Sequence, residues 1–273
     1  MINVEDIEKL IKYALTSGRL KNEKPLSLLF ISTVETGKTT VIRKHCLKCN
    51  RVFYTTDATA YGIIKETNNL RDIEERKFIH IVIPDLIKCT SRKQSTVNDF
   101  ISFMNSLIEE GVVNISTYAT KVRMNDSRKI HGIKCGLITS IAYNEFTDHR
   151  SRWSRIGFIS RLLPVSYSYK DSTVVKIFDY INDEGHLSEK IEKTKISKSD
   201  VKVKIPEEFN PKLSILAITK AKEQKLYGFR FLVMFRTLLK SIALFNGRKI
   251  ANEEDMKELE RLLGFVGFEF IKI

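Results

Sequence analysis

Residues 26–42 constrain the fold more than any other part of the chain. A short apolar run at 28–31 gives way to small polar residues, and a helix-compatible pattern resumes at Val41. This order of strand, loop and helix, with Gly37-Lys38-Thr39 at the turn, is typical of a phosphate-binding loop. We expect the phosphates to be contacted by the residues between the strand and the first helical turn: Ser32, Thr33, Val34, Glu35, Thr36, Gly37, Lys38, Thr39 and Thr40.

Each position of the loop has a chemical role. Backbone N–H groups at the start of a helix attract anions, and Lys38 adds a positive charge between the terminal phosphates. The Thr39 hydroxyl can ligate Mg²⁺, and Gly37 lets the backbone approach closely. Ser32 stands six residues before the lysine, where the motif usually has its first glycine. The alternative is an ordinary strand-to-helix turn without a ligand.

Length and charge set limits on the remaining possibilities. A chain of 273 residues, with 42% hydrophobic and 29% charged residues, suits a globular protein of one large or two unequal domains. The net charge of +13 favours a polyanionic partner. No apolar run approaches the roughly 20 residues that span a bilayer, and the first ten residues do not resemble a signal peptide. We therefore expect a cytoplasmic protein without a membrane partner.

The periodicity of apolar residues predicts an alternation of strands and helices, and hence an α/β fold with a mostly parallel sheet. Strands are predicted at 28–31, 51–55, 77–83 and 136–142, and directly after Arg161. Helices are predicted at 4–17, 95–110, 171–183, 213–222, 227–246 and 252–263, with the one at 171–183 closing the core. Turns or loops are expected at 58–62 and 150–155, and a charged linker at 184–206.

Asp85 follows the apolar strand 77–83, in which His80 is expected to be a buried, hydrogen-bonded core residue. We expect this strand to lie beside the phosphate-loop strand, so that Asp85 and Thr39 share a Mg²⁺ ion. The alternative is that Asp85 caps a turn or helix. Leu86 follows, where the usual motif has a second acidic residue, which leaves open the group that polarises water.

Two short β-like runs at 112–118 and 129–134 resemble a basic hairpin. The hairpin carries Lys121, Arg123, Arg128, Lys129 and Lys134. These side chains could contact a DNA backbone, or the hairpin could simply be a solvated arm. Cys46 and Cys49 share one helix face, as buried structural cysteines often do, and no second pair with metal-ligand spacing follows.

Together these segments resemble the core of AAA+ ATPases, most of all the minichromosome-maintenance helicase branch and small ATPases of phages, plasmids and archaeal mobile elements. The resemblance rests on the phosphate loop, RVFYTTDATAYGIIKE at 51–66, the strand ending in Asp85, EEGVVNISTYA at 109–119, and Ser160-Arg161-Leu162. It covers roughly residues 26–169 and, more weakly, 221–263.

The resemblance implies roles for further residues. Ser140 or Asn144 would sense the γ-phosphate, Arg161 would be an arginine finger acting on a neighbouring subunit, and Arg230 would be a second sensor. The hairpin at 121–129 would grip DNA. The implied organisation is an AAA+ core at 1–183, a linker at 184–206 and an all-helical lid at 207–273, assembled with ATP and Mg²⁺ into a hexameric ring or a filament.

Three hypotheses follow from these observations. The first is a DNA-acting ATPase motor such as a helicase, and the second is a nucleotide switch that recruits a partner to DNA and hydrolyses ATP slowly. The third is a DNA-binding scaffold with a degenerate nucleotide site. The basic hairpin favours the motor, whereas the missing second carboxylate after Asp85 favours the switch.

Overall fold

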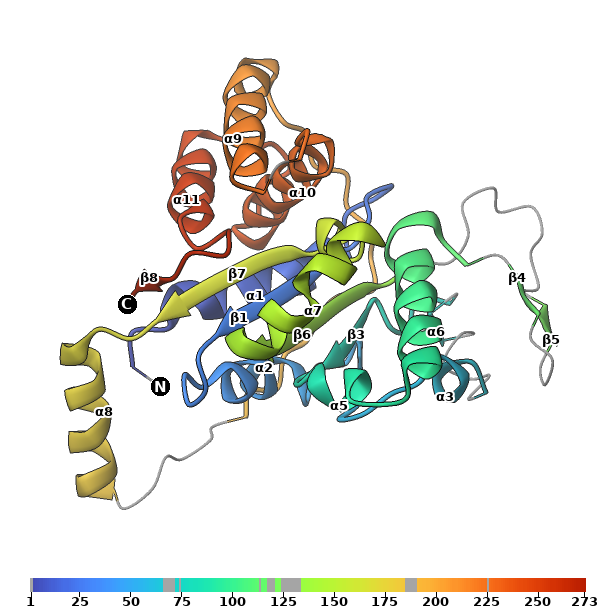
Figure 1. Cartoon of the computed structure of the whole chain (residues 1–273). Helices are drawn as coiled ribbons and strands as arrows, with labels where there is room; N and C mark the ends of the chain where they lie inside the picture. The colour runs from blue at the N-terminus through green and yellow to red at the C-terminus, as the bar shows by residue number, and fades with distance from the viewer. Residues whose placement is uncertain are drawn as a thin grey trace.

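The computed structural model describes residues 2–65, 72–73, 75–112, 114–116, 121–123, 134–184, 191–224 and 226–273. A central parallel sheet carries helices on both faces, and a group of C-terminal helices stands beside it (Figure 1). The strands are β1 Leu28–Ser32, β2 Val52–Tyr54, β3 His80–Ile83, β6 Gly136–Ala142, β7 Leu163–Ser168 and β8 Ile271–Lys272. The main helices are α1 Glu5–Ser17, α2 Lys38–Cys46, α3 Ala60–Lys65, α5 Ile87–Thr90, α6 Gln94–Asn105, α7 Tyr143–Arg155, α8 Asp171–Glu184, α9 Asn210–Glu223, α10 Phe229–Phe245 and α11 Glu253–Leu263.

The six strands are ordered β2-β3-β6-β1-β7-β8, and every neighbouring pair is parallel. All five residues of β1 and all four of β3 are buried, because helices cover both faces of the sheet. One core cluster joins a sheet face to α1, α2 and the C-terminal helices, and the other joins the opposite face to α3, α6 and α7. The predicted α/β architecture with a parallel sheet is confirmed.

The lateral order of the strands differs from the expectation in one place. β6 lies between β1 and β3, so the prediction that the Asp85 strand neighbours the phosphate-loop strand is wrong. Gly136 allows β6 to lie between β1 and β3. A Cβ atom at this position would lie 2.4 Å from the His80 ring and 2.9 Å from the Leu26 carbonyl oxygen, which is too close for either contact. His80 is fully buried and its Nε2 lies 3.0 Å from that same oxygen, as expected for a core histidine.

Two local predictions are also wrong. Residues 58–62 contain the start of α3, and the predicted loop at 150–155 is the last part of α7, whose Phe146 and Trp153 are buried. The hairpin pairs β4 Asn114–Ser116 with β5 Lys121–Arg123, a strand that the sequence did not predict, and the strand expected at 129–134 falls almost entirely on residues that the structure does not describe. Residues 124–133 lie outside the described part of the chain.

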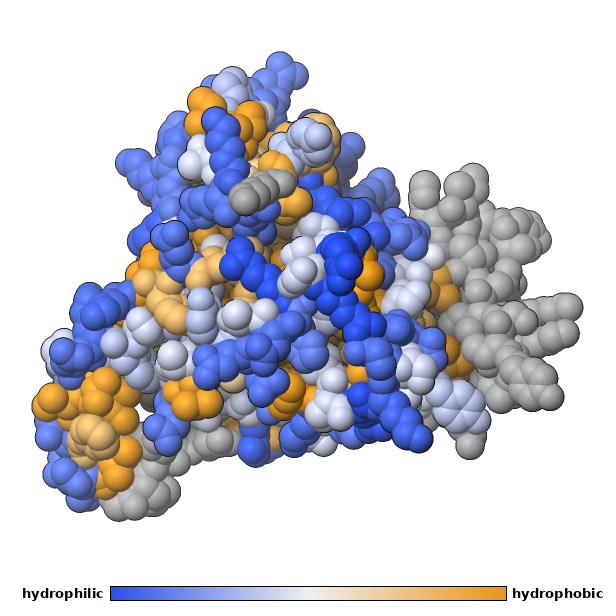
Figure 2. All heavy atoms as spheres, in the orientation of Figure 1, coloured by the Kyte–Doolittle hydropathy of each residue, from blue (hydrophilic) through white to orange (hydrophobic). Residues whose placement is uncertain are grey.

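α8 does not close the core, contrary to the prediction. It projects from the body at the end of β7 (Figure 1), and Thr173 is its one buried residue. β8 occupies the sheet edge beside β7, and the Thr173 hydroxyl donates to the Ile273 carbonyl oxygen at 2.8 Å. The helix is therefore fastened at its first turn, and Figure 2 shows apolar side chains gathered on its free part.

Residues 191–206, which we call the strap, follow the body closely although an exposed linker was expected. The side chain of Asn50 bonds both backbone groups of Ile196, and Arg51 donates to the Ser197 carbonyl oxygen at 2.8 Å. Val201 then forms a parallel bridge with Leu20. These hydrogen bonds act together with the buried Val203 and with Ile196 and Ile205, which pack against the core, to hold the segment on the body.

The C-terminal helices share a core with the sheet domain. α10 packs against α1, and the rings of Tyr13 and Phe245 meet edge to face at 5.2 Å. The shared cluster thus crosses the boundary predicted at 184–206. Within the described ranges, no helix combines the length and apolar character needed to traverse a bilayer.

Candidate functional site

The loop between β1 and α2 is closed by its own hydroxyl groups. Ser32 is buried and its Oγ contacts the Thr36 hydroxyl, which in turn donates to the Thr33 carbonyl oxygen at 3.0 Å. Gly37 caps α2 with φ of 73°, a left-handed conformation that glycine adopts without strain. Ser32 has no positive φ, so a serine is tolerated where the usual motif has glycine.

Two tyrosines at the carboxyl end of the neighbouring strand β7, one in its last residues and one directly after it, fix the loop from outside. The hydroxyl groups of Tyr167 and Tyr169 donate to the Thr36 carbonyl oxygen at 3.1 and 2.9 Å. Thr33, Val34, Glu35 and Thr39 remain exposed. The loop is therefore rigidly held along its base while its outer residues face solvent.

Lys38 folds back into the centre of the loop. Its Nζ donates to the carbonyl oxygens of Ser32 and Thr33 at 3.1 and 2.5 Å, and to the Thr36 hydroxyl at 3.3 Å. Burial lowers the pKa of Lys38 to about 8, although the negative charge of Asp85 partly opposes this shift. A cation that is desolvated and bonded to neutral oxygens is poised to accept an anion.

Asp85 lies beyond the carboxyl end of β3, at the same sheet edge as the loop. Its Oδ1 accepts a hydrogen bond from the Ile87 backbone N–H at 3.2 Å, so the carboxylate also caps a turn. Ser140 supports this turn, because its hydroxyl donates to the Pro84 carbonyl oxygen at 2.5 Å and its own carbonyl accepts from the Leu86 N–H. The structure thus assigns Ser140 a contact with the Asp85 turn.

Asn144 occupies a different position from Ser140, although both were candidates for the same role. It is exposed in the first turn of α7, two residues after Ala142, which is in register with Ser32. Of the two, Asn144 is the side chain that faces solvent at the sheet edge carrying the phosphate loop.

Arg161 and Arg230 meet at the opposite sheet edge. Arg161 donates to the Gly157 carbonyl oxygen at 2.7 Å and to Glu110 at 3.1 Å, while Arg230 donates to the Ser160 hydroxyl at 2.7 Å. The Arg161 Nε is buried without a hydrogen-bond partner. Both guanidinium groups line a cavity of about 250 Å³ between the sheet domain and α10.

The two groups of residues cannot meet within one chain. Arg161 precedes β7, whose Leu163 is in register with Leu28 at the start of β1, whereas the loop follows Ser32 at its end. The four steps between the first and last residues of β1 span about 13 Å at roughly 3.3 Å per step. The structure therefore brings Lys38 and Asp85 to one edge, and Arg161 and Arg230 to the other.

The predicted DNA-contacting residues are described only in part. The backbones of Lys121 and Arg123 form β5 of the two-stranded hairpin. Arg128 and Lys129 lie outside the described residues.

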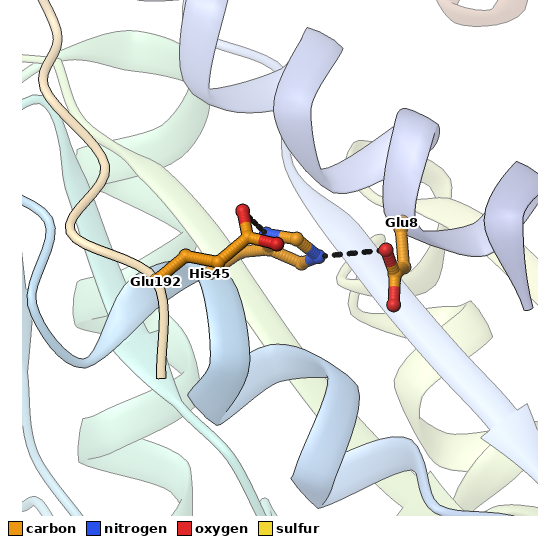
Figure 3. A group of neighbouring side chains, drawn as sticks. All are labelled: Glu8, His45 and Glu192. Carbon is orange, nitrogen blue, oxygen red and sulfur yellow. Dashed lines mark ion pairs between the residues drawn. The ribbon is translucent and has the colours of Figure 1, made fainter. Parts of the chain in front are cut away.

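A group of ionisable side chains, which the sequence did not indicate, surrounds the buried His45. His45 is fully buried on α2, with Nε2 3.4 Å from Glu8 of α1 and Nδ1 3.1 Å from Glu192 of the strap (Figure 3). Lys44 also pairs with Glu8 at 2.6 Å. Burial opposes ionisation of Glu8, but His45 and Lys44 together lower its pKa to about 2. No local pattern could reveal this cluster, because its members come from three distant segments.

These three side chains place one ligand atom each within 4.8 Å of the others, as a cation site requires. However, Glu8 lies at Nε2 of the imidazole and Glu192 lies at Nδ1. A metal ion binds one nitrogen of a histidine ring, so an ion at either nitrogen would lie beside one carboxylate and on the other side of the ring from the second. Lys44 already supplies a positive charge to Glu8. The contacts of Glu8 and Glu192 with Lys44 and His45 therefore tie α1, α2 and the strap together. Nearby Cys46 and Cys49 are buried free thiols whose pKa values are raised by burial.

The sequence matches no protein-family model, and no curated protein matches it. Functional assignment consequently depends on the geometry of the two sheet edges.

Proposed function

We propose that this protein binds and hydrolyses ATP with Mg²⁺ as an AAA+-like P-loop ATPase that assembles with itself and acts on DNA. The observation that carries the proposal is the position of Lys38, a buried ammonium enclosed by the loop and facing the charge of Asp85. The C-terminal helices α9–α11 serve as the lid of this core. The parallel sheet, with loop and aspartate at the carboxyl edge, supports the proposal.

The residues at the loop fit a nucleotide and its metal. Lys38 exchanges its contacts with the Ser32 and Thr33 carbonyl oxygens for phosphate oxygens, and backbone N–H groups at the start of α2 add further donors. The exposed Thr39 hydroxyl and the Asp85 carboxylate supply the oxygen ligands that Mg²⁺ prefers. Bound Mg²⁺ supplies charge neutralisation on the transferred phosphoryl group. In this proposal Asn144, which is exposed at the same sheet edge, contacts the terminal phosphate.

Hydrolysis then requires a second copy of the chain. Arg161 and Arg230 lie at the edge remote from their own loop, so they act on the nucleotide of a neighbour. Arg161 must leave Glu110 to do so, and the buried, unbonded Nε indicates that its present pairing is incomplete. The competing role, a structural ion pair between Arg161 and Glu110, is tested in the Discussion.

A slow nucleotide switch is the second candidate function. Leu86 follows Asp85 and is fully buried, so a second carboxylate is absent from the place that usually orients the attacking water. In this alternative, ATP binding builds the assembly on DNA, and hydrolysis resets it. Turnover well below about 1 s⁻¹ in the presence of DNA would favour the switch over the motor.

The central experiment is a nucleotide-binding titration of Lys38→Ala. We expect loss of ATP binding with an unchanged melting temperature, because the change removes a loop cation and leaves both core clusters intact. Lys48→Ala is the matched control, since Lys48 is an exposed lysine just after the same helix. Equal ATP affinity for Lys38→Ala and the parent would refute the proposal.

DNA binding has its own test. The charge of +13 and the basic residues of β5 lead us to expect an affinity for DNA that falls steeply with salt. The logarithm of the binding constant should fall with the logarithm of the salt concentration, with a slope of about 0.9 for each neutralised phosphate. Binding should be measured by fluorescence anisotropy from low to physiological salt, and affinity indifferent to salt would remove the DNA part of the proposal.

A further inference from the structure

α8 presents an apolar surface that the rest of the described chain does not cover. Val174, Ile177, Phe178 and Ile181 follow the spacing of one helix face, and none of them belongs to either core cluster. Phe178 is 60% exposed, and the adjacent Val175 is 56% exposed. Figure 2 shows this apolar surface on the projecting helix. An exposed apolar surface of this kind is removed from water only when a partner covers it.

A second apolar surface lies at the start of α10. It consists of Tyr227, Phe229 and Val233, which we call the α10 patch, with exposed fractions of 87, 76 and 48%. The two aromatic rings stack with centroids 6.0 Å apart, and Val233 follows Phe229 by one helical turn. Stacked, exposed aromatic rings next to a helix are typical of protein interfaces.

The two surfaces have opposite charge. α8 contains one basic residue, Lys176, and four acidic residues, all exposed: Asp171, Asp179, Asp183 and Glu184. Residues 220–236 contain one acidic residue, Glu223, and five basic residues: Lys220, Lys222, Lys225, Arg230 and Arg236. Surfaces of opposite sign attract each other, whereas two α8 helices would repel.

The two surfaces also lie at opposite edges of the sheet. α8 leaves the body two residues after Tyr169, whose hydroxyl contacts the phosphate loop. The α10 patch includes Phe229, which is adjacent to Arg230 and lines the cavity that holds Arg161. The α8 surface therefore lies at the sheet edge that carries the loop, and the α10 patch lies at the edge that carries Arg161 and Arg230.

We propose that α8 of one copy docks on the α10 patch of the next copy, in a head-to-tail contact. Because the contact joins two different surfaces, it repeats from copy to copy and builds a ring or a filament. It brings the arginines of one copy toward the loop of its neighbour, and in this respect the inference rests on the proposed function. The occupant of the α8 surface is thus a second copy of this chain.

Two single substitutions test the contact. Phe178→Asp damages the α8 surface and Phe229→Asp damages the α10 patch, and each should raise the protein concentration needed for assembly by about tenfold or more. Assembly should be followed by sedimentation velocity with an ATP analogue and DNA. Ile250→Asp is the matched control, since Ile250 is an apolar side chain that is 58% exposed away from both surfaces.

Mixing the two variants gives the decisive result. Each keeps one intact surface, so an equimolar mixture should form a 1:1 dimer through the one remaining good contact and should not grow further. If Phe229→Asp fails to fold by circular dichroism, Tyr227→Asp replaces it. The inference is overturned if the parent stays monomeric with nucleotide and DNA, if either variant assembles like the parent, or if the mixture stays monomeric.

Nucleotide binding separates this inference from the proposed function. Phe178→Asp should bind ATP with the affinity of the parent, because Phe178 lies outside the loop. Unchanged assembly of the variants together with ATP binding that depends on Lys38 would refute the α8 contact alone. ATP binding that is absent from the parent would refute the proposed function, while the mixing result would still decide the contact.

Discussion

The hydroxyl of Tyr169 donates a hydrogen bond to the carbonyl oxygen of Thr36 at 2.9 Å, beside a similar bond from Tyr167. Since α8 begins two residues later, this contact connects the base of the projecting helix to the phosphate loop. The loop therefore has a direct physical connection to the surface through which we propose that copies associate.

The pair of tyrosines leads to a prediction of non-additive stability. Tyr167→Phe or Tyr169→Phe alone should lower the free energy of unfolding by about 0.5–1.5 kcal/mol, because the Thr36 carbonyl keeps one hydroxyl donor. The double variant leaves that carbonyl without either hydroxyl and should lose more than the sum of the two. Urea unfolding measures all three, and strict additivity would show that the two bonds act independently.

Nucleotide binding should depend on pH through Lys38. Burial lowers the pKa of the free lysine to about 8, and phosphate contact favours its protonated form. Binding above this pH therefore takes up a proton, and affinity should fall as pH rises, approaching tenfold per unit. Calorimetric titrations from pH 7 to 9.5 without metal would measure the effect.

Two variants make the Lys38 prediction specific. Asp85→Asn removes the charge that raises the Lys38 pKa, so the fall in affinity should begin at a lower pH. Lys38→Arg keeps its charge throughout this range, so any residual affinity should not vary with pH. An affinity of the parent that is constant from pH 7 to 9.5 would contradict the assignment of Lys38.

The cluster of Glu8, His45 and Glu192 predicts a stability change at low pH. The pKa of Glu8 lies at about 2 in the folded protein and near its ordinary value of 4.5 in the unfolded chain. Its stabilising contribution is therefore complete above about pH 4.5 and is lost as pH falls toward 2. Glu8→Gln should melt at a lower temperature than the parent at pH 7, and the difference should shrink over that window.

The control for this cluster is Glu5→Gln on the same helix. Glu5 is exposed, so its substitution should leave the melting temperature nearly unchanged at every pH. Equal pH dependence of the two variants in scanning calorimetry would mean that this cluster contributes nothing specific.

Arg161→Ala should retain ATP binding and lose hydrolysis, since a finger arginine supplies roughly 10³ to 10⁵ in rate. Mixed with Lys38→Ala, which keeps its arginine, it should regain part of the activity at interfaces that combine an intact loop with an intact finger. Arg155→Ala is a suitable control, because Arg155 is an exposed arginine near the end of α7. Activity that does not depend on protein concentration, together with no recovery in the mixture, would show that Arg161 has only a structural role in its ion pair with Glu110.

Continuous apolar runs made the strands the most predictable part of the fold. β6 was predicted at its observed bounds, whereas its place between β1 and β3 depends on the fit of Gly136 against His80, which no local pattern records. α7 was missed because its polar residues and arginines obscure the seven-residue spacing between Phe146 and Trp153.

The candidate site divides in the same way. The candidate phosphate loop could be proposed from sequence because its residues are contiguous and each residue type suits a role in binding phosphate. The convergence of Arg161 with Arg230, and of His45 with Glu8 and Glu192, arises from tertiary contacts between segments far apart in the chain. The sequence suggests roles for the two arginines, but only the three-dimensional structure shows that they line the same cavity.

The contact between α1 and α10 has a consequence for the synthesis of the protein. The apolar face of α1, including Leu10 and Ile11, packs against α10, which begins more than 200 residues later, at Phe229. At roughly 5–20 residues per second, that face stays uncovered on the ribosome for on the order of ten seconds or more. The first helix to be made is thus among the last to be buried, and a nascent chain of this protein is a natural client for chaperones during that interval.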